Sequence, residues 1–305
     1  MLGNLCWNLS FVLRLNEAHE TSRDSVWLYR VLVHTNPQSY TSGLALGLRY
    51  LSYHVSNLGH HSEGLPPIEE SVNLYRHLAT TDPGFHPQLA YSLNSLSGRL
   101  RSLGRVSDAL PPIEESVGIR RRLVGGDPTS YRPHLAISLL NLSIILSDLG
   151  RHSDGLPPIQ ESVTLRRELV AKDPASHRAD LAYSLINLSA TLSVLERRSE
   201  ALAAIQECVC IHRQLVAMHP ASYSPDLALS LDSLSCSFYH LGRYTEALDA
   251  GEESLSLYRP LFAKYPLAYT HHLQRILNRV AWTLDKLGRQ DEASAAHTEA
   301  NSLSS

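Results

Sequence analysis

The side chains that most often carry out chemistry in proteins are present in this sequence, but their spacing does not favour a metal site. The sixteen histidines include no two that are three or four residues apart, the spacing that places two ligands on one face of a helix. The neighbouring pairs His60-His61 and His271-His272 would point in different directions from a helix. Cys208 and Cys210 have no second cysteine pair at zinc-site spacing, which favours their interpretation as small buried residues. We therefore expect no metal site.

Sequence motifs of the common enzyme classes are also missing. The chain contains no glycine-rich phosphate loop, no nucleophile elbow and no zinc-protease helix motif. Catalytic groups that are dispersed along a chain are rarely hosted by repeated sequences of the kind described next. We expect a protein that is not an enzyme and that uses no cofactor.

Instead of a catalytic motif, the sequence contains one pattern that returns along its whole length. A Leu-Gly pair recurs at steps of 45, 46, 46, 46 and 46 residues, with glutamate in place of glycine in one repeat, Leu195-Glu196. The other pairs are Leu58-Gly59, Leu103-Gly104, Leu149-Gly150, Leu241-Gly242 and Leu287-Gly288. A period of this size indicates a solenoid of stacked repeat units.

Each repeat contains two helical patterns, which we name the A helix and the B helix. In the A helix of residues 135–149, leucine recurs at steps of four and three, which predicts one apolar face. We expect the A helices to begin at Pro87, Pro133 and Pro225 and to end at the Leu-Gly pair, where glycine can adopt a left-handed conformation. The B helix should end before a proline, as at Asp127-Pro128.

The start of the B helix is marked by a hydroxyl residue followed by an acid, a pattern typical of a helix N-cap. The pattern occurs at Ser62-Glu63, Ser107-Asp108, Ser153-Asp154, Ser199-Glu200 and Thr245-Glu246. Proline pairs follow at Pro66-Pro67, Pro111-Pro112 and Pro157-Pro158. Because proline removes a helical hydrogen bond, either the B helix begins at the prolines or it is kinked there after one loose turn.

These patterns predict a single all-α solenoid of about seven helical hairpins without strands, spanning residues 1–305. The expected repeats are 1–37, 38–83, 84–128, 129–174, 175–220, 221–266 and 267–305. The last repeat carries Ala295, Ala296, Thr298 and Asn301 where others have larger apolar residues, which is typical of a terminal cap. The first starts partway through an A helix, with Leu5, Trp7, Leu9 and Phe11 uncovered, so we expect the chain to be the tail of a longer protein or the product of a gene model that lacks its 5′ part.

The repeat resembles the tetratricopeptide repeat. Leu142 and Ser143 match the large-small pair of that family's first helix, and Gly155, Ile159 and Ser162 match the pattern of its second helix. Other units supply Ala109, Ile113 and Ser116, or Ala201, Ile205 and Cys208. The period exceeds the family's usual length, and the longer form resembles kinesin-light-chain repeats and fungal repeat arrays.

The resemblance implies a superhelix whose concave groove, built mainly from A helices, holds an extended peptide or a partner helix. The groove positions it implies are Arg49, Tyr50, Tyr53, Tyr91, Asn94, Asn141, Tyr183, Asn187, Asn278, Arg279 and Trp282. Asparagine both donates and accepts, so a row of asparagines can pair with a peptide backbone. The alternative is that these asparagines bond neighbouring helices, and Ser95 and Ser233 interrupt the row.

Composition narrows the class of partner. Charged residues make up 19% of the chain with a net charge of −3 and mixed signs, so we expect neither nucleic acid nor a membrane surface. No apolar run is long enough to span a membrane, and the four cysteines lack a disulfide framework, which indicates a reducing, cytoplasmic compartment. The expected partner is a protein or peptide.

The resemblance leaves a second interpretation of the function open. In it, the chain is the sensor or regulatory region of a larger protein with a nucleotide-binding or protease-like module upstream.

Overall fold

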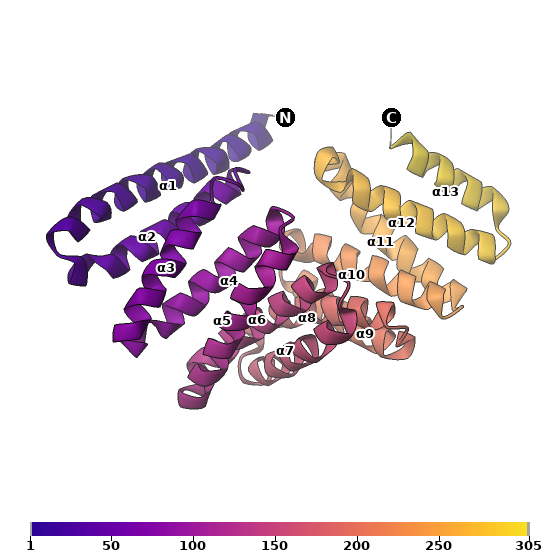
Figure 1. The fold of residues 1–305 in the computed structure, drawn as a ribbon. Coiled ribbons are helices and arrows are strands. Elements are labelled where there is room, and N and C mark those ends of the chain that lie inside the picture. Colours follow the sequence, from indigo (N-terminus) through magenta and orange to yellow (C-terminus); the bar gives the residue numbers. More distant parts are fainter. Residues whose placement is uncertain (1, 304–305) are drawn as a thin grey trace. The chain divides into compact units, whose positions relative to one another are not determined.

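The computed structural model describes residues 2–303, with side chains from Arg14 onward, and this part of the chain is helical throughout (Figure 1). The helices are α1 (Leu2–Thr35), α2 (Pro37–Asn57), α3 (Leu65–Thr81), η1 (Pro83–Phe85), α4 (His86–Ser102), α5 (Val106–Gly126), α6 (Pro128–Asp148), α7 (His152–Lys172), α8 (Pro174–Val194), α9 (Arg198–Met218), α10 (Pro220–His240), α11 (Tyr244–Lys264), α12 (Pro266–Lys286) and α13 (Gln290–Ser302). The predicted all-α solenoid class is confirmed, since consecutive helices pack on one another within α1–α6 and within α7–α13 and the described residues contain no strand.

The chain divides into two compact units, Met1–Arg151 and His152–Ser305. The even-numbered helices are the A helices. The odd-numbered helices from α3 onward are the B helices. The first unit holds α1 to α6 and the second α7 to α13.

The turn from each A helix into its B helix has one geometry. In the α4–α5 turn the Gly104 amide donates to Arg101 O and the Arg105 amide to Leu100 O, both at 2.9 Å, which is the Schellman arrangement. Gly104 has a φ of +73°, and the glycines of four other turns are also left-handed, as the sequence predicts. The exception is Glu196, which holds a φ of +57° in the α8–α9 turn at the cost of strain for a residue with a Cβ.

Replacing Glu196 by glycine should therefore stabilise the second unit. We expect the free energy of unfolding to rise by about 1 kcal/mol, because glycine adopts this conformation without a steric penalty. Chemical denaturation of the full chain measures the change. The reverse substitution, Gly242→Ala in the corresponding turn, should lower stability by about the same amount. Changes of the same sign in both variants would contradict the argument.

The connections from a B helix to the next A helix are shorter than expected. Between α5 and α6 only Asp127 intervenes, and its side chain accepts a hydrogen bond from the Ser130 amide at 3.1 Å. Proline occupies the first position of the next helix, where no hydrogen bond is lost. The prediction that A helices begin at Pro133 and Pro225 is thus wrong, because α6 and α10 already begin at Pro128 and Pro220.

The predicted hydroxyl caps of the B helices are also wrong. In α5, α9 and α11 the regular helix starts two residues earlier, directly after the Schellman turn, so an arginine becomes the N-cap residue. In α3 it starts three residues after Ser62, and Gly64 is the N-cap residue. In α5, α9 and α11 the acid lies at the third helical position and pairs with that arginine. Arg105 contacts Asp108 at 2.7 Å and Arg197 contacts Glu200 at 2.6 Å, and the same contact recurs in α11 and α13.

Of the two arrangements that the sequence left open, only a helix that begins at the prolines is observed, and only in α3. In α3 the regular helix begins at Leu65, with the prolines in its first turn and a looser turn before it. In α5 and α7 the helix already starts at Val106 and His152 and continues through its proline pair.

The helical hairpin expected in residues 1–37 is absent, because α1 runs unbroken from Leu2 to Thr35. The repeat period places Val12-Leu13 at the position of the Leu-Gly turn, and neither residue favours a left-handed conformation. The second half of α1 takes the B position, since Arg30 pairs with Glu70 of α3 at 2.6 Å. The side chains of Leu5, Trp7, Leu9 and Phe11 lie outside the described residues.

Small residues let the helices approach one another. Ser97 of α4 donates to Ala109 O of α5 at 2.7 Å, and Ser116 of α5 donates back to Ala90 O at 2.9 Å. Equivalent bonds join α2 with α3, and α10 with α11. These buried contacts fix the two helices of a hairpin and leave the A helices to present their remaining faces.

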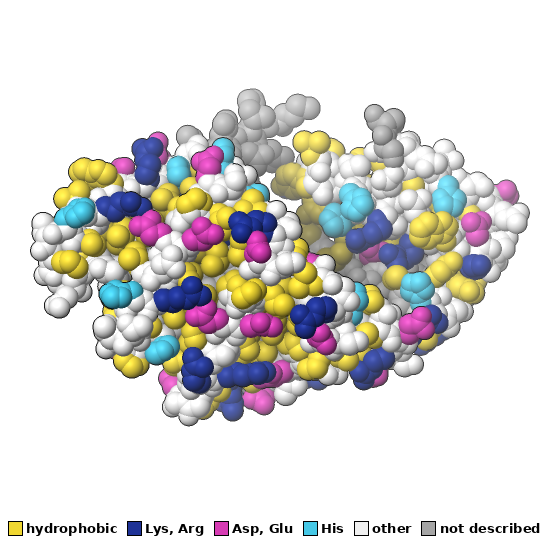
Figure 2. Space-filling view, viewed as in Figure 1, with side chains coloured by type: hydrophobic (Ala, Val, Ile, Leu, Met, Phe, Trp, Pro, Cys, Tyr) yellow, Lys and Arg dark blue, Asp and Glu magenta, His cyan; other side chains and the backbone are white. Residues whose placement is uncertain are grey.

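Arginine–glutamate pairs link successive B helices on their exposed faces. Besides Arg30–Glu70, they are Arg76–Glu115 in the first unit and Arg167–Glu207, Arg213–Glu253 and Arg259–Glu299 in the second. Basic and acidic side chains accordingly lie side by side on the face seen in Figure 2. Exposed pairs of this kind contribute little each, about 0–1 kcal/mol.

Candidate functional site

The residues predicted to bind a partner all lie on A helices, and the structure assigns them to two separate sets. The first unit contains Arg49, Tyr50 and Tyr53 on α2, Tyr91 and Asn94 on α4, and Asn141 on α6. The second unit contains Tyr183 and Asn187 on α8, and Asn278, Arg279 and Trp282 on α12.

In the first unit, a cluster forms around the ring of Tyr91. The guanidinium carbons of Arg49 and Arg120 lie 5.4 and 5.0 Å from the ring centroid, within range of a cation–π interaction. The Tyr91 hydroxyl lies 2.7 Å from His134 Nε2. Arg120 comes from the B helix α5, is only 2% exposed, and donates to Ser138 Oγ at 2.7 Å and to the His134 carbonyl.

This cluster is positively charged and has no carboxylate within it. Neither Arg49 nor Arg120 forms an ion pair with a described residue, and Arg49 Nε is buried without a hydrogen-bond partner among them. Burial lowers the pKa of Arg120 to about 10, so the side chain remains a cation near neutral pH. Burial and then the charge of Arg120 lower the pKa of His134, which favours its neutral form.

The asparagines of the first unit bond to each other. Asn141 Nδ2 donates to Asn94 Oδ1 at 3.1 Å, and the Ser138 hydroxyl donates to the same oxygen at 3.2 Å. This contact joins α4 to α6, which is the structural alternative that the sequence left open. Each asparagine retains hydrogen-bonding capacity beyond this contact, because an amide side chain offers two donors and an acceptor with two lone pairs.

Aromatic side chains on the A helices extend into solvent. Tyr50, Tyr53, Tyr183 and Trp282 are between 49% and 58% exposed, whereas most apolar side chains of these helices are buried. Tyr91 differs, because it is partly buried in the arginine cluster. Exposed tyrosine and tryptophan are the side chains that most often dominate protein interfaces.

In the second unit, two arginines of α12 are paired with a buried carboxylate. Arg275 and Arg279 of α12 contact the Asp232 carboxylate of α10 at 2.6 and 2.8 Å, and this carboxylate is 2% exposed. Asn187 donates to the Tyr183 carbonyl of its own helix at 2.8 Å, which turns its amide group toward the helix backbone.

A shallow pocket of about 220 Å³ lies beside Trp282. It is lined by His271, Gln274, Arg275, Asn278, Arg279 and Trp282, all from α12. The structure therefore brings together three of the predicted residues here: Asn278, Arg279 and Trp282.

Side chains that could hold a metal ion are not clustered in the described residues. No three histidine, cysteine or acidic side chains from Arg14 onward are placed to bind one ion. Burial raises the pKa of the Cys208 thiol to about 12, so the reactive thiolate is disfavoured, and the thiol donates to the Ala182 carbonyl. No helix in the described range is both long enough and apolar enough to cross a membrane.

Comparison with known families identifies the repeat. The sequence model of the tetratricopeptide repeat matches residues 89–130, 181–220 and 227–262. These three segments are similar to tetratricopeptide repeats. No curated protein matches the sequence.

Solved structures with tetratricopeptide-type folds resemble this one at low sequence identity. BtubC (BKLC) from P. vanneervenii is 16% identical over 82% of this chain and 93% of its own, with a TM-score of 0.65. The nearly identical repeats of a putative kinesin light chain from Podospora anserina are 17% identical over 70% of this chain and 94% of their own, with a TM-score of 0.54. The apo form of RapI is 13% identical over 85% of this chain and 83% of its own, with a TM-score of 0.55. At these identities the likeness concerns the fold alone.

Two contributors to the arginine cluster, Arg120 and His134, were missed because the tetratricopeptide pattern draws attention to other positions. A signal for Arg120 exists in the sequence: in the B helices from α3 to α11, a large polar side chain follows the small residue by four positions. The series is Tyr75, Arg120, Arg166, His212 and Tyr258, and every member is buried. Its neighbours on the following A helix include His134 and Asp180, which contacts Arg166 at 2.6 Å.

A tetratricopeptide-repeat fold is a scaffold for protein–protein interaction, and such scaffolds are in general not enzymes. The class of partner that follows from the family is a protein or a peptide.

Proposed function

We propose that the first unit binds an extended, acidic segment of a partner protein along the exposed faces of α2, α4 and α6. The observation that carries this proposal is the arginine cluster around Tyr91, which has two guanidinium groups and no carboxylate. A cation that lies at a partly buried site without a counter-charge gains most from an acidic ligand, because the surrounding protein screens the attraction less than water does.

The neighbouring side chains support an extended ligand. Tyr50 and Tyr53 are one turn apart on α2 and provide exposed aromatic surface beside Arg49. Asn94 and Asn141 keep unused donors and acceptors that can pair with a peptide backbone. In the second unit, Arg166, the counterpart of Arg120, contacts Asp180, and Arg275 and Arg279 contact Asp232. The proposal therefore assigns the acidic segment to the first unit.

The proposal predicts which peptides the full chain selects and which substitutions weaken them. Peptides enriched from a displayed random library should be rich in aspartate and glutamate. The affinity of a synthetic copy of one such peptide, measured by fluorescence polarisation, should fall by about tenfold for Tyr50→Ala/Tyr53→Ala and for Arg49→Gln. Higher salt should weaken binding further.

Arg30→Gln is the matched control, since it removes the same charge from an exposed Arg–Glu pair on the B helices. It should leave affinity within about twofold. Asn141→Ala separates the two roles of the asparagines, because a purely structural pair would reduce stability and leave affinity unchanged. Selection of basic peptides, or an unaltered affinity of Arg49→Gln, would refute the proposal.

A further inference from the structure

The first helix leaves part of the repeat's packing surface uncovered. The second half of α1 takes the B position, but residues 2–13 continue the same helix instead of folding back as its A helix. A cavity of about 420 Å³ remains between α1 and α2. It is lined by Ala18, Thr21, Ser22, Ser25, Gly47, Tyr50 and His54.

The α1 wall of this cavity contains positions that are buried in the other B helices. Ala18 is partly exposed, whereas its counterparts are all buried: Gly64, Ala109, Gly155, Ala201, Ala247 and Ala293. Ser25 is also partly exposed, whereas its counterparts are 0% exposed: Ser71, Ser116, Ser162, Cys208, Ser254 and Ala300.

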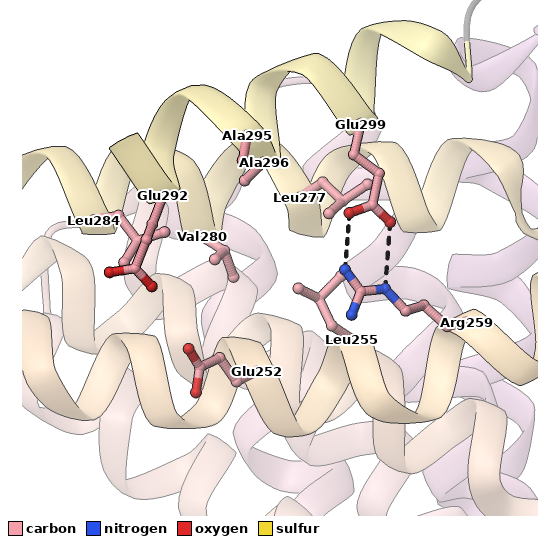
Figure 3. A pocket seen from close by; sticks show the side chains of 10 residues that line it. All are labelled: Glu252, Leu255, Arg259, Leu277, Val280, Leu284, Glu292, Ala295, Ala296 and Glu299. Atoms are coloured by element: carbon pink, nitrogen blue, oxygen red, sulfur yellow. Dashed lines mark hydrogen bonds and ion pairs between the residues drawn. The ribbon is translucent and has the colours of Figure 1, made fainter. Parts of the chain in front are cut away.

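In the other hairpins, the A helix covers these positions. Ser71 of α3 donates to the Ala45 carbonyl of α2 at 2.7 Å, and the same bond joins α10 with α11. In the last hairpin, α12 lies directly against α13, with Leu277 and Val280 of α12 buried below it (Figure 3). The cavity beside α1 is thus the place of an A helix that is not filled.

The repeat fixes which residues belong in that place. In complete hairpins, a serine of the A helix donates to the carbonyl oxygen of the residue twelve positions later, as Ser97 does to Ala109 at 2.7 Å. The bond recurs at Ser52–Gly64, Ser189–Ala201 and Ser235–Ala247. The period puts Cys6 and Ala18 at the same two positions. Because twelve residues of one continuous α-helix span about 18 Å, α1 cannot bring its own residues 6 and 18 together.

The sequence of residues 2–11 has the pattern of an A helix. Asn4-Leu5-Cys6 corresponds to Asn187-Leu188-Ser189 of α8. Leu2 stands at the repeat position of six leucines that are at most 1% exposed: Leu48, Leu93, Leu139, Leu185, Leu231 and Leu277. The segment that matches the empty place is therefore present in the chain, on the part of α1 that cannot reach it.

We infer that two copies of this chain exchange these segments, so that residues 2–11 of each copy occupy the cavity between α1 and α2 of the other. The two helices of a hairpin are antiparallel, and position 6 of one copy lies opposite position 18 of the other. The two α1 helices therefore run antiparallel, with the two-fold axis beside residue 12. This is where the repeat period places the turn that α1 lacks. Exchange of an identical element is a low-cost route to a dimer.

The exchange does not depend on the function proposed for this unit, because it does not involve the arginine cluster. Tyr50 borders both surfaces. Its counterpart Ser233 on α10 stays partly exposed although α8 and α12 pack on either side, so an added A helix leaves the outer edge of this position free.

The test measures the mass of the full chain by size-exclusion chromatography with light scattering, which should show a dimer. Leu13→Gly restores the turn sequence of Leu103-Gly104-Arg105, since Arg14 already follows. Residues 2–11 can then fold back onto their own α1, and the dissociation constant of the dimer should rise by about tenfold or more. Leu13→Ala, which keeps the helix continuous, is the matched control and should remain dimeric.

Two further variants test the surface and the register. Thr21→Glu, at an exposed position of the cavity wall, should also produce a monomer, whereas Asn16→Glu, exposed on α1 outside the cavity, should not. In Ala18→Cys, mild oxidation should join the new thiol to Cys6 of a second chain, as located by peptide mass spectrometry. When Leu13→Gly is added, the same disulfide should lie within one chain.

The inference is overturned if the unmodified chain is monomeric, or if Leu13→Gly and Thr21→Glu both leave a dimer intact. It is also overturned if the oxidised dimer of Ala18→Cys lacks the bond to Cys6. Arg49→Gln should weaken the acidic peptide and leave the dimer unchanged, so that the exchange and the proposed function can fail separately.

Discussion

Replacing both Arg275 and Arg279 by alanine should lower the free energy of unfolding by about 3–5 kcal/mol, the largest effect we expect from polar substitutions. Both arginines contact Asp232, whose carboxylate is 2% exposed. Without them a charge remains buried with no counter-ion, and desolvation of an unpaired ion is more costly than the loss of an exposed pair. Chemical denaturation of the full chain, followed by circular dichroism, measures the loss.

The repeat itself supplies the control for this prediction. One repeat earlier, the position of Asp232 holds Ile186, and two repeats earlier it holds Leu140. The triple variant Asp232→Ile/Arg275→Ala/Arg279→Ala replaces the ion cluster by an apolar side chain that the fold accepts elsewhere. It should recover most of the lost stability. A triple variant no more stable than the double variant would show that the buried charge is not the cause.

Ile113→Ala should destabilise the first unit by about 3 kcal/mol, through lost burial and the cavity left behind. Ile113 is fully buried in a cluster with Leu100, Ala109 and Ile145. Ile159 and Ile205 stand at the same repeat position and are equally buried. The sequence therefore marks this position as core from its recurrence alone.

At the same repeat position, α11 has Gly251, and there the opposite change should be harmful. A Cβ on Gly251 would lie 2.7 Å from Val280 Cγ2 and 3.3 Å from Ser235 Oγ. We expect Gly251→Ala to cost about 1–2 kcal/mol, although alanine is ordinarily the better helix former. Gly98→Ala on α4 is the control, since nothing lies within 4 Å of its added Cβ and it should gain about 0.5–1 kcal/mol. Equal effects at the two glycines would contradict this account.

These two positions illustrate how far the sequence predicts the fold. The period, the all-α class and the left-handed glycines followed from spacing and from glycine's freedom at φ above zero. The replacement of the buried isoleucine by Gly251 in α11 could not be predicted in this way. The space of the missing side chain is filled by Val280, which comes from a neighbouring helix. The helix starts were misplaced for a related reason. A hydroxyl before an acid looks the same whether it caps a helix or lies in its first turn, and the Schellman turn before it decides.

The candidate site was predictable in outline only. The exposed positions of Tyr50, Tyr53 and Trp282 agree with the A-helix faces that the resemblance implied, while their binding role stays a prediction. The asparagines could not be assigned to ligand or to structure from identity, since their amide groups suit both, and Asn94 and Asn141 meet in space. Arg120 was missed because a buried cation is judged by its partners, which lie 14 and 18 residues away on α6.

The short 3-10 helix η1 has a consequence for how such a chain can change during evolution or design. Ser71 and Ser92 are 21 residues apart, Ser116 and Ser138 are 22 apart, and both pairs make the same 3.0 Å contact. The repeat that is one residue short contains η1 at its B-to-A junction, the only 3-10 segment in the described residues. A 3-10 turn uses about 3.0 residues where an α turn uses about 3.6, so local rewinding compensates the missing residue. The junction is thus a place where a single-residue deletion leaves the inter-repeat interface in register.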